Sequence, residues 1–221
     1  LWARASRNFQ NDVEYTLQHR RMAGWEASIA HREHLGDAAL DLTISHRRGT
    51  GAFNALHTDE ESNGTGTSRP QITRLGAQLG IPASAFGQRW NYALAAQVQQ
   101  AHNRLIAQDQ FAIGSRYTVR GFDEQNFLTA DHGWTLRNEL ALMLGQTAHQ
   151  LYVGIDHGEV SGPSASALLG RSLTGAAFGV GGSLGSRGAL NYELFIGTPL
   201  HKPDGFKTST ANVGFSLGAS F

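Results

Sequence analysis

Cysteine is absent from the 221 residues, and proline is scarce at 5. Without cysteine, a disulfide framework, a cysteine zinc site and a thiol nucleophile are all excluded. The 27 glycines beside so little proline favour a chain of strands and turns over helices or a proline-rich linker. Neither sign of charge dominates, because Lys+Arg and Asp+Glu number 18 each. We therefore expect no nucleic-acid partner.

Long hydrophobic runs are also missing. The mean hydropathy is -0.30, and no apolar run approaches the roughly 18 residues of a membrane helix. This excludes a helical membrane protein but leaves a transmembrane β-barrel open, because a barrel strand shows lipid only every second residue. The sequence also has no nucleophile elbow, phosphate loop or zinc signature. We expect no enzyme activity, catalytic residue, cofactor or metal site.

Two-residue alternation of apolar and polar side chains is the main local signal, and it predicts roughly ten strands of membrane-spanning length. The strands are expected at about 12–18, 25–32, 40–47, 71–81, 90–98, 134–142, 151–156, 178–184, 190–196 and 213–221. Residues 22–24 are expected to be a short link, 82–88 a turn and 101–133 a long loop. The sequence thus predicts an all-β fold.

Connections of two kinds separate these strands. Tight turns such as Leu35–Asp37 alternate with long polar loops such as 49–68, as in outer-membrane barrels with short periplasmic turns and long extracellular loops. A soluble β-sandwich would also alternate and remains an alternative. Aromatic residues at strand ends and a polar second face favour the membrane. On that second face we expect four charged residues to line a wet lumen, namely Glu14, Arg137, Glu139 and Glu193.

The segment Gly114–Phe122 contains an arginine in an unusual setting. Arg120 lies between Val119 and Gly121, and Phe122 follows. Gly121 permits backbone conformations that other residues avoid, and Phe122 offers an apolar anchor. This pattern indicates a functional loop, and the alternative is an ordinary exposed loop arginine.

The last residues form a further signal. Phe215, Leu217 and the terminal Phe221 alternate with small polar residues, which is typical of the final strand of an outer-membrane barrel and of the signal read by barrel-assembly machinery. The chain opens on Leu1 without a signal peptide. We therefore interpret it as a C-terminal fragment with its export signal upstream.

Together these motifs resemble the transporter barrels of two-partner secretion, of the haemolysin-activator or filamentous-haemagglutinin-secretion type. The resemblance rests on Val119–Phe122, on Gly133–Trp134 with Arg137–Leu140, on Leu151–Gly158 and on Phe221. It implies an outer-membrane barrel of about sixteen strands in a Gram-negative bacterium, preceded by POTRA domains. Residues 1–221 would supply roughly the last ten strands, with the POTRA domains and early strands absent.

The resemblance also implies roles for single residues and partners. The loop carrying Arg120 would fold back into the lumen and pair with Asp156, and strand parity agrees, because Asp156 lies opposite Leu151, Val153 and Ile155. The barrel would secrete an unfolded partner exoprotein, such as a haemolysin, an adhesin or a contact-dependent inhibition toxin. Alternatives are an assembly factor or insertase of the same superfamily, or a passive porin or adhesin.

Histidines are plentiful, and several stand beside arginines near strand ends, as in His31–Arg32 and His46–Arg47–Arg48. A metal or catalytic site is disfavoured, because these residues fall on different hairpins without an orienting carboxylate. Contact with lipid headgroups or with lipopolysaccharide phosphates explains basic residues at a membrane rim. Lipid and lipopolysaccharide are therefore expected partners.

Overall fold

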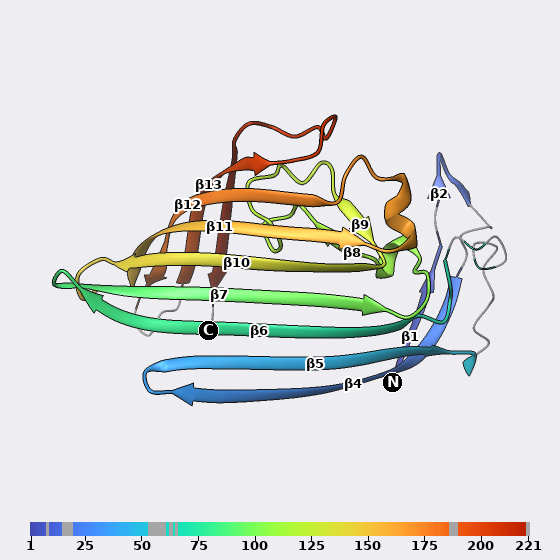
Figure 1. The fold of residues 1–221 in the computed structure, drawn as a ribbon, viewed down its shortest axis with the longest axis horizontal. Helices are drawn as coiled ribbons and strands as arrows, with labels where there is room; N and C mark the ends of the chain where they lie inside the picture. Colours follow the sequence, from blue (N-terminus) through green and yellow to red (C-terminus); the bar gives the residue numbers. More distant parts are fainter. Residues whose placement is uncertain are drawn as a thin grey trace.

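A single curved antiparallel sheet of ten strands dominates the computed structural model, which describes residues 1–7, 9–14, 20–52, 61, 64, 66–185 and 190–219 (Figure 1). In sheet order the strands are β1 (Trp2–Ser6), β4 (Arg20–Leu35), β5 (Ala38–Thr50), β6 (Gln71–Ala85), β7 (Gln88–Ala101), β10 (His132–Met143), β11 (His149–Ser161), β12 (Ser172–Leu184), β13 (Leu190–His201) and β14 (Asn212–Ala219). The expected all-β fold class is confirmed. Within the described residues β1 and β14 are the two edges of the sheet, and they do not pair with each other.

Small elements complete the fold. Two short hairpins pair β2 (Phe9–Gln10) with β3 (Val13–Glu14) and β8 (Phe111–Ile113) with β9 (Leu128–Ala130). In the described part of the chain, two short 3-10 helices, η3 (Ala107–Asp109) and η4 (Pro163–Ala167), lie in the connections. No helix among the described residues is long and apolar enough to cross a membrane.

The first strand of the sheet differs from the expectation. Only Val13–Glu14 of the expected 12–18 strand is a described strand, and it pairs in a separate hairpin, while 15–19 lie outside the described residues. The sheet opens instead with Trp2–Ser6, paired to β4. Its outward residues are alanines, Ala3 and Ala5, so the apolar face of this strand is too weak to stand out in the sequence.

Strand lengths were also underestimated at the rims. Residues 22–24, expected to be a link, lie inside β4, and β6 runs through Pro82 to Ala85. The segments Met22–Gly24 and Pro82–Ala85 lack a regular alternation of polar and large apolar residues, so the sequence signal fades before the backbone pairing ends. The turn before β7 is therefore only Phe86–Gly87.

The outer face of the sheet carries the apolar side chains. Ile29, Ile44 and Leu75 are direct cross-strand neighbours, and each is exposed, at 71%, 45% and 48%. On later strands, Ile155, Phe178, Ile196 and Phe215 are also exposed. A continuous exposed apolar face is the opposite of what the exposed face of a sheet in a soluble protein presents. It matches the lipid-facing band of a transmembrane barrel. No second sheet covers this face among the described strands, which argues against the sandwich.

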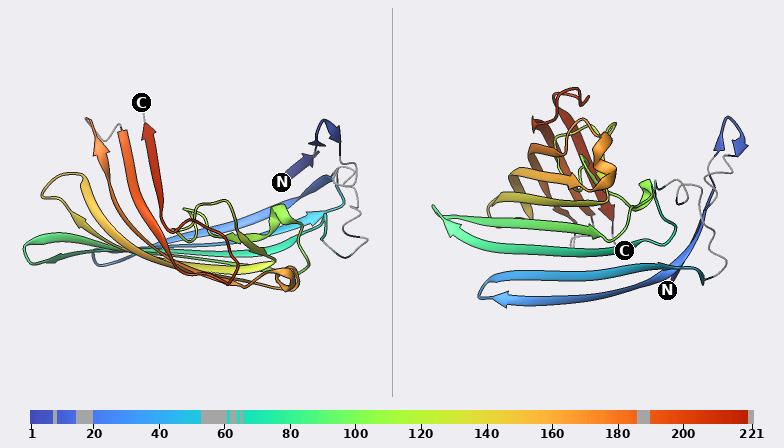
Figure 2. Two further views of the ribbon diagram at one scale, coloured as in Figure 1. Left: turned by 90° about the horizontal axis from the view of Figure 1, so that it is seen from above. Right: turned by 45° about the vertical axis from the view of Figure 1, so that its right-hand side comes forward.

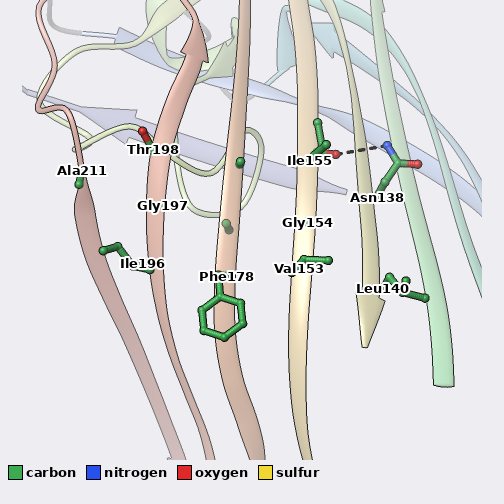
Figure 3. Close-up of a pocket in the computed structure, with 12 residues that line it drawn as sticks. Asn138, Leu140, Val153, Gly154, Ile155, Phe178, Ile196, Gly197, Thr198 and Ala211 are labelled. Carbon is green, nitrogen blue, oxygen red and sulfur yellow. Dashed lines mark hydrogen bonds between the residues drawn. The ribbon is translucent and has the colours of Figure 1, made fainter. Parts of the chain in front are cut away.

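A shallow groove interrupts the outer face between β10 and β13, with a volume of about 610 Å³ (Figure 3). Leu140, Val153, Phe178 and Ile196 line it. Asn138 also faces outward here, and its amide is satisfied: Tyr92 Oη donates to Asn138 Oδ1 at 2.8 Å and Asn138 Nδ2 donates to the Ile155 carbonyl at 3.3 Å. Because its polar atoms have partners, Asn138 is tolerated on the lipid side.

Connections at the two ends of the sheet differ in length. One end has tight turns, at 36–37, 86–87 and 144–148, and the other has the long segments 51–70, 102–131, 162–171 and 202–211. Segment 102–131, which we call the inward loop, contains β8 and β9 and lies on the concave face of the sheet (Figure 2). The fold thus presents the Val119–Phe122 motif to the inner wall.

Candidate functional site

The tip of the inward loop is packed against the wall. Val119, Arg120 and Phe122 are 0%, 2% and 3% exposed. Val119 and Phe122 join an apolar cluster with wall residues such as Val160 and Leu173, and the Phe122 ring meets Phe206 edge-on at 5.9 Å between centroids. Phe122 is the apolar anchor of the loop, and Arg120 is not a solvated surface arginine.

Arg120 and Asp156 form a bidentate ion pair. Arg120 Nε donates to Asp156 Oδ2 at 2.7 Å and Nη2 donates to Oδ1 at 2.9 Å. The backbone N–H of Arg120 donates to Oδ2 at 3.0 Å. Both side chains are 1% exposed. Bidentate geometry fixes orientation as well as contact, so the pair holds the loop backbone in register with β11.

Glu139 on β10 completes the environment of the guanidinium. Arg120 Nη1 donates to Glu139 Oε2 at 2.7 Å. Burial by itself would lower the pKa of Arg120, but hydrogen bonds and charge from Asp156 and Glu139 outweigh it and raise the pKa above its ordinary value. Arg137, a neighbour on β10, brings its Nε to 3.7 Å from Asp156 Oδ2. Two cations thus face two carboxylates on the inner wall.

A second polar chain runs beside this pair toward the last strands. Tyr152, whose ring lies 5.5 Å from the Arg120 guanidinium carbon, donates its hydroxyl to Glu193 Oε1 at 2.7 Å. Glu193 lies 3.9 Å from Nη2 of Arg116, another arginine of the inward loop. Arg116 Nη1 also donates to the Phe215 carbonyl on β14 at 2.8 Å. Arg116 and Tyr152 lie within the segments Gly114–Phe122 and Leu151–Gly158, but no role of their own was predicted for them from the sequence.

Four inward-facing glycines, Gly154, Gly158, Gly175 and Gly197, form the surface on which the loop rests, and we call them the glycine seat. A Cβ at Gly154 would overlap the Arg120 guanidinium, and one at Gly175 would overlap the Arg120 carbonyl oxygen. A Cβ at Gly197 would lie 2.9 Å from the Gly121 nitrogen. Gly121 itself has φ +104°, so the close approach requires glycine on both sides.

Asp123 ties the loop to the segment between β13 and β14. Its Oδ2 accepts hydrogen bonds from the Ser209 N–H at 2.7 Å and the Ser209 hydroxyl at 2.9 Å. These bonds, led by the backbone one, lower the pKa of Asp123 from its ordinary value. Asn212 Nδ2 adds a bond to the Phe122 carbonyl. The tip is therefore held from two sides.

The start of the inward loop has its own buried carboxylate, Asp109. Its Oδ1 lies 3.3 Å from Nη2 of Arg4 on β1 and 3.3 Å from Nη1 of Arg47 on β5, and its side chain is 1% exposed. Gln99 Nε2 donates to the Asp109 carbonyl at 3.0 Å. This cluster could not be predicted from the sequence, because its members come from three distant segments. Ion pairs thus hold the inward loop at three of its described residues, Asp109, Arg116 and Arg120.

Other residues expected to be functional lie as follows. Arg137, Glu139 and Glu193 are on the inner wall. Phe215 and Leu217 face outward from β14, 73% and 67% exposed. The side chain of Glu14 and the whole of Phe221 lie outside the described residues.

The chain is similar to known proteins in both sequence and fold. The family model described as haemolysin secretion/activation protein ShlB/FhaC/HecB matches residues 1–182. The outer membrane transporter CdiB-2 of Burkholderia pseudomallei (strain 1026b) is 37% identical over 204 residues, which is 92% of this chain and 35% of that protein.

Two solved structures share the arrangement of strands. CdiB from Acinetobacter baumannii superposes with a TM-score of 0.82 at 29% identity, covering 98% of this chain and 37% of the other. CdiB from Escherichia coli gives a TM-score of 0.80 at 21% identity over 97% of this chain and 40% of the other, and this match shows the fold alone. The chain spans between 35% and 40% of the length of these three proteins. On these findings, and as its motifs suggested, the chain belongs to the ShlB/FhaC/HecB family of outer-membrane secretion and activation proteins of Gram-negative bacteria.

Proposed function

We propose that this chain is the C-terminal part of a barrel that secretes a partner exoprotein across the outer membrane, and that the inward loop is part of the secretion path. The observation that carries the proposal is the buried Arg120–Asp156 pair, which fixes the loop on the inner wall. A passive porin needs no such attachment. In the whole protein, POTRA domains and early strands would complete the translocator.

The polar inner wall suits passage of an unfolded chain. Arg137, Glu139 and Glu193 keep the lumen hydrated next to the loop, so a polypeptide in transit would keep its backbone groups solvated. No ATP is available outside the inner membrane, so folding of the cargo at the surface would supply direction. The Arg120–Asp156 pair would hold the loop at rest and return it after passage.

The partners follow from the same proposal. The cargo would be a haemolysin, an adhesin or a contact-dependent inhibition toxin. The barrel-assembly machinery would read the final strand, where Phe215 and Leu217 face outward. An assembly factor of the same superfamily is the second candidate function, and only a secretion assay separates the two.

Secretion by the full-length parent carrying Arg120→Ala is the test. We expect cargo release into the medium to fall strongly compared with the wild type at equal outer-membrane level, because the loop loses its bidentate attachment while Phe122 still packs. Arg32→Ala is the matched control: Arg32 pairs with Asp41 on the same inner face, but its side chain is 65% exposed. We expect the control to secrete normally.

Two results would count against the proposal. Unchanged secretion in the Arg120→Ala variant would return Arg120 to the status of a structural loop residue. A barrel that fails to assemble, seen as loss of the heat-modifiable band in gel electrophoresis, would show that the pair serves folding instead of transport.

A further inference from the structure

Four residues on neighbouring strands make a compact cluster on the outer face, which we call the first rim cluster: Trp25 on β4, His46 on β5, Thr73 on β6 and His102 just after β7. The Trp25 and His46 rings lie 5.6 Å apart. His46 Nδ1 and Thr73 Oγ1 are 3.0 Å apart, and Thr73 Oγ1 is 3.4 Å from His102 Nε2.

The same set of residue types recurs on the second half of the sheet, as a second rim cluster: Trp134 on β10, His157 on β11, Thr174 on β12 and His201 on β13. The Trp134 and His157 rings lie 5.2 Å apart. His157 Nδ1 and Thr174 Oγ1 are 2.8 Å apart, and Thr174 is the direct cross-strand partner of His201. Two clusters of one design therefore stand on the outer face.

Both clusters lie where the apolar band gives way to the long loops. In the first, His46 is two residues from the lipid-facing Ile44, and β5 ends at Thr50 before a long connection. In the second, His157 is two residues from Ile155, and β11 ends at Ser161. Tryptophan gathers at the headgroup level of membranes. With the long loops outside, as in bacterial barrels, this level is the outer leaflet, where lipopolysaccharide is the principal lipid.

Charge distinguishes the two clusters at one equivalent position. The residue two places after each histidine is the direct cross-strand partner of the tryptophan: Arg48 opposite Trp25, and Glu159 opposite Trp134. Arg48 is exposed. The outward positions at the loop end of β4 to β7 carry a second arginine, Arg21, and none of them is acidic in the described strands. With Arg48 beside it, the first rim cluster is complementary to an anion, whereas the second rim cluster, beside Glu159, is not.

We propose that the first rim cluster, together with the adjacent Arg48, binds a phosphate group of lipid A on the outer face of the barrel. The Arg48 guanidinium supplies charge and paired donors suited to phosphate. The Thr73 contact fixes the His46 ring through Nδ1, and no described residue hydrogen-bonds its Nε2, which is placed to contact the ligand. Trp25 supplies the ring that sits at the interface beside the sugar and acyl chains.

Lipid binding to the purified full-length transporter tests this site. Bound lipid A is expected to raise the temperature at which the heat-modifiable band is lost. The measured quantity is the lipid A concentration that gives half of the maximal rise. We expect Arg48→Gln to weaken the response about tenfold, because a hydrogen bond to a charged group is lost, and His46→Ala to weaken it further. Glu159→Gln and His157→Ala, the matched changes at the second rim cluster, should leave it unchanged.

Two other lipids distinguish the source of the phosphate. Dephosphorylated lipid A should bind as weakly to the wild type as lipid A binds to the Arg48→Gln variant, and phosphatidylglycerol should not compete. Equal weakening by the Arg48 and Glu159 changes would overturn the proposal, as would full binding of dephosphorylated lipid A or effective competition by phosphatidylglycerol. Folding of each variant is checked by its heat-modifiable band without lipid, since Arg48 is exposed and its replacement removes no core contact.

Discussion

Replacement of Asp156 by alanine is expected to release the inward loop from the barrel wall. Among the described residues, Glu139 would remain as the carboxylate partner of Arg120, whose side chain is 1% exposed. Two of the three hydrogen bonds from its guanidinium to carboxylates would be lost. Removing one partner of a buried pair costs roughly 3–5 kcal/mol, because a desolvated charge is left uncompensated. This free-energy cost exceeds the stabilisation from packing a single loop side chain, so we expect the loop to detach from the barrel wall.

Limited proteolysis of the outer-membrane protein measures this release. We expect the Asp156→Ala variant to be cleaved within the inward loop under conditions that leave the wild type intact. Asp41→Ala is the matched control, since Asp41 is 38% exposed and pairs with an exposed arginine on the same face. If the double variant Arg120→Ala, Asp156→Ala is as sensitive as the sum of the two single variants, the residues do not act as a pair.

A single methyl group at Gly175 is expected to have nearly as large an effect. The Cβ of Gly175→Ala would overlap the Arg120 carbonyl oxygen. Backbone atoms of the loop and of β12 are both fixed by hydrogen bonds, so the clash cannot be relieved by a rotamer change. Overpacking of this kind costs typically about 1–3 kcal/mol, and relief here requires the loop to lift, which also lengthens the Arg120–Asp156 bonds.

Gly80→Ala is the matched control for this prediction. Gly80 faces the same lumen from β6, and a Cβ there would meet no atom of a described residue within 4 Å. The temperature at which the folded band disappears in gel electrophoresis should fall clearly for Gly175→Ala and stay unchanged for Gly80→Ala. Equal values for both variants would show that the seat tolerates a side chain and that the loop is not held closely.

The sequence was sufficient to predict features that repeat along the chain or stand out in composition. Alternation located nine of the ten sheet strands, since every second residue of those strands must face lipid. The same parity put Asp156 on the inner face. The strand Trp2–Ser6 escaped notice, because alanines replace the large apolar residues on its outer side.

Contacts between distant segments could not be predicted in this way. Gly154 and Gly158 flank Asp156, so their parity was visible, but their purpose depends on the loop backbone that approaches them. Asp109 meets Arg4 and Arg47 only after β1 and β5 have been placed in one sheet. Arg116 resembles any exposed arginine until β14 is brought beside it. The one sequence signal of such a contact was the glycine at every second inward position of β11, on either side of the charged Asp156.

Disulfide trapping of the loop on the wall tests the central claim most directly. These 221 residues contain no cysteine, so within them a pair introduced as Val119→Cys with Gly158→Cys reports only this contact. A Cβ at Gly158 would lie 3.0 Å from a Val119 methyl carbon, within reach of a disulfide, whose Cβ atoms are roughly 3.5–4.5 Å apart. Unlike a Cβ at Gly175, which overlaps backbone, its three nearest atoms are side-chain methyl carbons, and Val119→Cys removes one of them, so the seat can accept this side chain. In full-length protein in the outer membrane, we predict that mild oxidation links the pair nearly completely, and that adding Asp156→Ala lowers the yield. Two cysteines that react with a maleimide reagent yet form no disulfide would show that the inward loop does not rest on the glycine seat.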